Sequence, residues 1–224
     1  MRWDIFCKVI DNYGDIGVSW RLARQLAAEH HAVVRLWVDE LESLERLCPA
    51  ADAALDAQTL DGVEVRRWND DAAQARPAEV VIEAFACQLP EAYIASMAAA
   101  ARAPLWINLD YLSAEHWVAG CHGLPSRHPQ LPLTKFFFFP GFTADTGGLI
   151  REHGLYDERD AFQASSVAKR NFWSRLHVPK RARNEWRVSL FCYPTRRCRN
   201  CSRVCQPIRI RCAWWWRKAP RRFR

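Results

Sequence analysis

The sequence predicts an α/β protein, a Rossmann-like, mostly parallel and doubly wound sheet with helices on both faces. Strand-like apolar runs alternate with helical patterns over roughly the first 140 residues, which is typical of this architecture. Half of the 224 residues are apolar, so the chain can bury a sizeable core. No run approaches the roughly 18 consecutive apolar residues that a membrane span requires.

The strands are predicted from short apolar runs, several of them bounded by turn residues. The first run is almost continuously apolar, as a buried strand would be, and the third alternates more and is expected to be more exposed. The predicted strands cover residues 3–10, 33–38, 63–68, 80–85, 104–109 and 135–139, and a later strand covers 187–193.

The helices are predicted between these strands. Val18, Leu22 and Leu26 recur one turn apart, Pro90 suits the first turn of a helix, and Ser113 is a candidate N-cap. The predicted helices cover residues 18–30, 41–47, 90–102 and 113–119, and the charged stretch 151–185 is helix-forming.

The segment "VIDNYGDIGVSW", residues 9–20, joins the first strand to the first helix. In a doubly wound sheet, ligands bind at the carboxyl ends of the strands, near the point where the strand order reverses. The glycine spacing here is G-x-x-G, so the dinucleotide fingerprint G-x-G-x-x-G is absent. The corner instead carries two carboxylates, Asp11 and Asp15. They either form a site, or Asp15 caps the helix and Asp11 closes an Asx turn.

Charge and cysteine are concentrated at the end of the chain. Residues 194–224 hold ten arginines and one lysine with no acidic residue, so residues 1–193 carry a net charge of −4 although the whole chain carries +7. Four of the nine cysteines also lie there. The opening residues lack the pattern of a secretion signal, so we expect a soluble cytoplasmic protein with no membrane partner and no disulfide framework.

Several ordered blocks are similar to one known family. "WDIFCKVIDNYGDIGVSWRLARQL", "EVVIEAFACQLP", "LWINLDYLSAEHWVAGCHGLPS", "FFFPGFTADTGGLIRE" and "SLFCY" resemble blocks of the EarP family, the bacterial arginine rhamnosyltransferases of elongation factor P. The resemblance covers about 190 residues. It implies the N-terminal lobe of a GT-B type glycosyltransferase that transfers L-rhamnose from dTDP-β-L-rhamnose to an arginine of elongation factor P, with inversion and without a metal or other cofactor.

The resemblance assigns roles to the corner. Asp15 is expected to be the general base and Asp11 its orienting partner, because a carboxylate can grip the guanidinium fork and a second can take its proton. Asn12, Tyr13, Gly14 and Gly17 are expected to shape the donor side.

Four further residues carry weaker assignments. Phe191 and Tyr193 match an F-x-Y motif that contacts the nucleotide-sugar, or they simply pack in a strand. Tyr111 and Glu115 are expected to face the acceptor protein, or they belong to a capped surface helix.

The end of the chain departs from the family. We expect residues 1–186 to form the acceptor and catalytic lobe, 187–193 to begin the donor-binding lobe, and 194–224 to be an aberrant, disordered tail. Its composition matches a second lobe read in the wrong frame, so the chain is predicted to lack the donor lobe and to be inactive alone. One alternative is a module that binds elongation factor P without catalysis. Another is a zinc or nucleic-acid module built on Cys198, Cys201, Cys205 and Cys212, although nucleic acid is an unlikely partner.

Overall fold

A computed structural model describes residues 1–11 and 13–179 of the chain. These residues fall into two compact units, one of residues 1–153 and one that begins at Gly154. The second unit contains helices α6 (Leu155–Ala164) and α7 (Ser166–Arg175). The predicted domain boundaries at 186/187 and 193/194, and the tail itself, lie outside the described residues.

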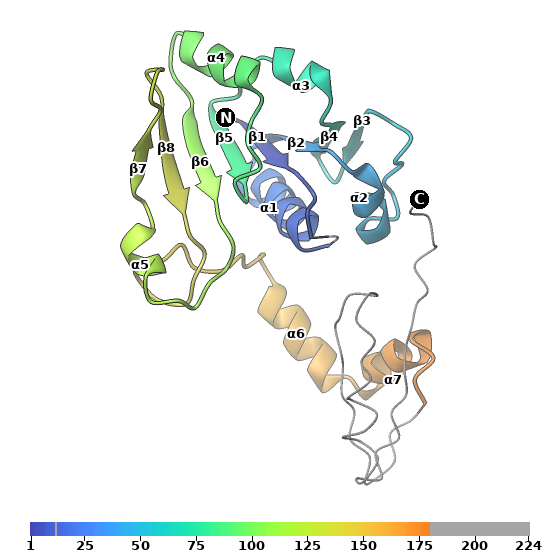
Figure 1. The fold of residues 1–224 in the computed structure, drawn as a ribbon. Coiled ribbons are helices and arrows are strands. Elements are labelled where there is room, and N and C mark those ends of the chain that lie inside the picture. The colour runs from blue at the N-terminus through green and yellow to red at the C-terminus, as the bar shows by residue number, and fades with distance from the viewer. Residues whose placement is uncertain (12, 180–224) are drawn as a thin grey trace, which may run out of the picture. The chain divides into compact units, whose positions relative to one another are not determined.

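The first unit is built on one eight-stranded sheet with the order β3-β4-β2-β1-β5-β6-β8-β7 (Figure 1). Six neighbouring strands are parallel, and an antiparallel strand closes each edge. The parallel strands are β1 (Arg2–Cys7), β2 (Val33–Val38), β4 (Val63–Arg67), β5 (Val80–Ala84), β6 (Leu105–Leu109) and β8 (Thr134–Phe138). The predicted mostly parallel α/β architecture is therefore confirmed.

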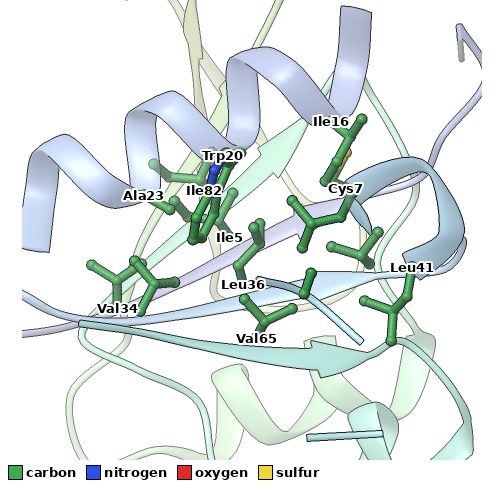
Figure 2. Close-up of a cluster of buried hydrophobic side chains, with 14 of the residues drawn as sticks. Ile5, Cys7, Ile16, Trp20, Ala23, Val34, Leu36, Leu41, Val65 and Ile82 are labelled. Atoms are coloured by element: carbon green, nitrogen blue, oxygen red, sulfur yellow. The ribbon is translucent and has the colours of Figure 1, made fainter. Parts of the chain in front are cut away.

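Both faces of the sheet are covered, because the side chains of each strand alternate between two cores. Ile5, Leu36 and Ile82 face α1 (Gly14–His30) and α2 (Leu41–Leu47), where Ile16, Trp20 and Ala23 of α1 pack onto them (Figure 2). On the opposite face Phe6, Trp37 and Val81 pack with residues of α3 (Asp70–Gln74) and α4 (Glu91–Ala99). The alternation of the strands thus decides which helix each side chain meets.

Most predicted elements occur within a few residues of their expected bounds, and three were missed. The missed elements are short: β3 (Ala57–Leu60), α3 and β7 (Pro125–Arg127). Two helix starts were wrong. α1 begins at Gly14 rather than Val18, and α5 (Val118–Cys121) begins well after Ser113. The Ser113 hydroxyl instead accepts a hydrogen bond from the Glu115 N–H in the loop before α5.

The strand order fixes where the sheet can hold a ligand. From β1 the chain builds outward through β2 and β4, and it then returns to the other side of β1 to build β5, β6 and β8. The reversal lies between β1 and β5. The loops that leave the carboxyl ends of these strands diverge there, which is the usual ligand position in such sheets.

Candidate functional site

The loop after β1 and the first turn of α1 bring Asp15 to the strand-order reversal. Asp15 has no solvent exposure (0%), and its Oδ2 accepts hydrogen bonds from the N–H groups of Ile10 and Asp11, each at 2.9 Å. Both donors precede the helix, and α1 has no side-chain N-cap. The alternative in which Asp15 merely caps the helix is therefore wrong: the carboxylate holds the preceding loop.

The second oxygen of Asp15 is bound by a residue from a distant part of the chain. The Tyr111 hydroxyl donates to Asp15 Oδ1 at 3.0 Å, from the loop that follows β6. The Tyr111 ring stacks on Phe85, directly after β5, with 4.4 Å between centroids and 18° between planes. Burial of the hydroxyl and its hydrogen bond to Asp15 raise the pKa of Tyr111 to about 12. Three adjacent strand ends thus contribute to one cluster.

Asp15 differs from the other buried carboxylates in the described residues. These are Asp4, with Arg35 Nε at 2.7 Å from its Oδ1, and Glu83, with Lys135 Nζ at 3.0 Å from its Oε2. Buried charges in proteins are normally paired because desolvation is costly. No cationic side chain within residues 1–11 and 13–179 forms an ion pair with Asp15. Among the described residues, the two N–H groups, the tyrosine hydroxyl and the positive end of the α1 dipole offset its charge.

Two further carboxylates act on the same tyrosine. Asp11 and Asp110 both raise the pKa of Tyr111 electrostatically, in addition to Asp15. Asp110 Oδ1 accepts from the Tyr111 N–H at 2.8 Å, and Asn108 Nδ2 donates to Asp110 Oδ2 at 3.3 Å. Three carboxylates thus act on one tyrosine, and such a concentration of negative charge favours a cationic ligand.

The two glycines of the corner differ in what they permit. A Cβ on Gly14 would lie 2.5 Å from Asp11 Oδ2, so only glycine allows that carboxylate to approach the start of α1. A Cβ on Gly17 would meet only Leu47 Cδ1 at 3.7 Å, an ordinary contact. Tyr13 lies at the N-cap and is 40% exposed. For Tyr13, Gly14 and Gly17, a role toward the donor stays a prediction.

Of the other predicted site residues, Tyr111 lies at Asp15 and Glu115 does not. Tyr111 joins the Asp15 cluster, whereas Glu115 is exposed in the loop that follows. Asn12, Phe191 and Tyr193 lie outside the described residues, as do the four cysteines of the tail.

Sequence reasoning missed Phe85 and Asp110. Phe85 directly follows β5, and Asp110 directly follows β6, so both lie at the carboxyl edge of the sheet. That position could have identified them as candidate site residues. Phe85, Ala86 and Gln88 have positive φ values of 56°, 53° and 60°, which mark an unusual turn that no sequence pattern indicated.

Two features of the described residues bear on other functions. None of the helices in residues 1–11 and 13–179 has both the length and the apolar character needed to cross a bilayer. In the same part of the chain, no group of three or more His, Cys, Asp or Glu side chains is arranged to hold a metal ion. The four cysteines found there are free thiols, of which Cys7 and Cys87 are buried.

Comparison with known proteins gives a consistent result. The model of the family described as elongation factor P rhamnosyltransferase EarP matches residues 3–209. The chain is 59% identical over 176 residues to a protein-arginine rhamnosyltransferase of Pseudomonas putida, covering 79% of this chain and 46% of that protein. It is 56% identical over 191 residues to the Pseudomonas aeruginosa enzyme of that name, covering 85% and 50%.

More distant relatives carry the same name. The Shewanella oneidensis protein-arginine rhamnosyltransferase is 46% identical over 200 residues, which covers 87% of this chain and 50% of that protein. A solved structure, from work on EarP-mediated arginine glycosylation of translation elongation factor EF-P, is 33% identical with a TM-score of 0.37, covering 80% of this chain and 37% of that one. The chain spans about half the length of the curated relatives it matches. The predicted family is confirmed: this chain belongs to the EarP family of elongation factor P rhamnosyltransferases.

Proposed function

We propose that this chain carries the acceptor side of a protein-arginine rhamnosyltransferase, which moves L-rhamnose from dTDP-β-L-rhamnose to an arginine of elongation factor P in the cytoplasm. The observation that carries the proposal is the buried Asp15 carboxylate, which has hydrogen-bond donors but no ion-pair partner among the described residues. The acceptor arginine supplies that partner.

The chemistry requires a carboxylate held in this way. A guanidinium is protonated at physiological pH and is a poor nucleophile. As one of its nitrogens attacks the anomeric carbon, the bond from that carbon to the dTDP oxygen breaks and dTDP leaves. One N–H proton passes to Asp15, so the product guanidinium keeps a single positive charge. Attack from the side opposite dTDP inverts the anomeric centre and is mainly a problem of positioning.

The hydrogen bonds of Asp15 distinguish its two oxygens. Oδ2 is fixed by two backbone N–H groups, which belong to the loop itself and hold the carboxylate in place. Among the described residues, Oδ1 is bound by the side chain of Tyr111 and by no backbone group. We therefore assign Oδ1 as the oxygen that accepts the proton, with Asp11 orienting the guanidinium from beside Gly14.

The proposal is tested with a hybrid protein in which residues 1–179 of this chain continue into the corresponding C-terminal part of the Pseudomonas aeruginosa relative. Incubated with dTDP-L-rhamnose and elongation factor P, the hybrid protein should add one deoxyhexose to one arginine, as measured by peptide mass spectrometry. Asp15→Asn should reduce turnover by roughly 10²–10⁴-fold, the contribution of a general base. A hybrid protein that folds and binds the donor but leaves every arginine unmodified would contradict the proposal.

The chain alone is a matched comparison. Since it spans half of its relatives, we expect it to bind elongation factor P without transferring rhamnose. This is the second candidate function, a binding module. Turnover by the 224-residue chain alone would contradict the expectation that a further donor-binding part is needed.

A further inference from the structure

The half-exposed Tyr111 side chain is hydrogen-bonded to the fully buried Asp15 carboxylate. Asp15 has 0% exposure although Tyr111 itself is 48% exposed. Tyr111 is also the side chain that binds Oδ1 of Asp15, the oxygen that no backbone group holds among the described residues. A guanidinium that is to reach Oδ1 therefore meets the Tyr111 hydroxyl at that position.

The attachment of Tyr111 allows it to move. Its ring is held by stacking on Phe85, which is itself partly exposed, and its hydroxyl donates to Asp15. Stacking between two partly exposed rings is a weak attachment, so rotation of the Tyr111 ring toward solvent is accessible. The Asp15 carboxylate, by contrast, is fixed by the two backbone donors and the start of α1.

A second tyrosine–carboxylate pair in the chain shows the same donors together with a guanidinium. Asp4 accepts a hydrogen bond from the Tyr93 hydroxyl and one from the Ala78 N–H. The Arg35 guanidinium spans both oxygens of Asp4, with Nε to Oδ1 at 2.7 Å and Nη2 to Oδ2 at 2.8 Å. Oδ1 of Asp4 therefore accepts a hydrogen bond from the guanidinium, whereas Oδ1 of Asp15 accepts one from the tyrosine hydroxyl.

We infer that Tyr111 is a positioning residue that occupies Asp15 Oδ1 in the absence of acceptor and exchanges this hydrogen bond for the guanidinium N–H groups of the acceptor arginine. This inference rests on the proposed function and deepens it. The exchange keeps the buried carboxylate hydrogen-bonded in both states. It also makes access to Asp15 conditional on a ligand with a guanidinium, because the forked donor matches a carboxylate better than an ammonium does.

The exchange is measured on the whole chain by NMR with tyrosine labelled at the ring carbon that bears the hydroxyl. The Tyr111 resonance is assigned with Tyr111→Phe. N-acetyl-arginine amide is the probe, and N-acetyl-lysine amide at equal ionic strength is the control. The Tyr111 resonance should move saturably with the arginine probe toward the position of a solvent-exposed tyrosine, and much less with the lysine compound. Tyr93 should not move, because Arg35 already occupies Asp4.

A second measurement uses the variants. Tyr111→Phe removes the competing donor, so the arginine probe should bind roughly three- to tenfold more tightly, and Asp15→Asn should abolish that binding. A Tyr111 resonance that stays in place at saturation, weaker binding by Tyr111→Phe, or no Asp15-dependent binding would each overturn the inference. The resonance shift is measured on the wild-type chain, and Tyr111→Phe is needed only to assign the resonance. It also involves no sugar transfer, so its failure is separate from a failure of the hybrid protein.

Discussion

Two buried carboxylates, one within β1 and one in the first turn of α1, lie in contrasting environments. Asp4, within the strand, is 1% exposed and binds Arg35, the Tyr93 hydroxyl and the Ala78 N–H. Asp15, beyond the carboxyl end, is 0% exposed and binds the Tyr111 hydroxyl and two backbone N–H groups. Each carboxylate has a tyrosine and the backbone as donors. Only Asp4 has a guanidinium among the described residues.

The difference separates a structural ion pair from a candidate site. At Asp4 the chain provides both charges, so the group is complete and ties β1 to β2. At Asp15 the same kinds of donors hold a carboxylate whose counter-charge we assign to the substrate. A buried charge without a partner is costly, and such costs are concentrated at functional sites.

The first prediction removes the internal guanidinium. Arg35→Leu should destabilise the fold by about 3–5 kcal/mol, because Asp4 would remain buried without its counter-ion. Urea unfolding followed by circular dichroism measures the loss. Asp15→Asn is the matched comparison and should cost much less, since the amide can keep the backbone donors and donate to the Tyr111 oxygen. Equal losses would remove the distinction between the two carboxylates.

The second prediction concerns the position of Asp11. Gly14→Ala places a Cβ 2.5 Å from Asp11 Oδ2, so the carboxylate must move away; this should weaken binding of the arginine probe and cost at most about 1 kcal/mol of stability. Gly17→Ala, three residues later in α1, should be neutral or stabilising by up to about 1 kcal/mol. Thermal unfolding and probe titration of both variants test this. Similar behaviour of the two would show that the Gly14 contact does not matter.

The third prediction uses an exposed carboxylate–guanidinium pair. Arg21 donates from Nε to Glu152 Oε1 at 2.6 Å and from Nη2 to Oε2 at 2.7 Å, and these hydrogen bonds lower the pKa of Glu152 to about 2. A depressed acid pKa gives stability that is present above the unfolded value of about 4.5 and is lost as pH falls toward 2.

Because this pair is partly exposed, Arg21→Gln should cost only about 0.2–1 kcal/mol at pH 7. The difference from wild type should disappear as the pH falls from 4.5 toward 2. Unfolding measured across this pH range provides the test. A loss as large as that of Arg35→Leu would show that burial does not set the strength of these pairs.

The sequence predicted the parallel sheet well because strand alternation and helix periodicity are local. The bounds of β2 and α2 agree with the predictions at both ends. α1 was predicted to start four residues late, because Asp15 resembles an N-cap and two glycines precede the apolar pattern. The carboxylate is held by backbone groups before the helix, and no local pattern reveals this.

The candidate site was predictable in part. Asp15 and Asp11 were identified from their position after the first strand and from the resemblance. The link from Asp15 to Tyr111 spans 96 residues and depends on β6 lying two strands from β1, so it required the strand order. That Asp15 has no ion-pair partner in the described part of the chain also depends on its neighbours in space, which a sequence does not provide.

The most direct test of the account is a double-mutant cycle between Asp15 and the acceptor arginine. Calorimetry would measure binding of elongation factor P to the hybrid protein, with Asp15→Asn on one side and glutamine in place of the modified arginine on the other. The account predicts a coupling free energy of about 1–3 kcal/mol, because each change removes the same ion pair. Additive losses within about 0.5 kcal/mol would show that the buried carboxylate does not receive the acceptor guanidinium.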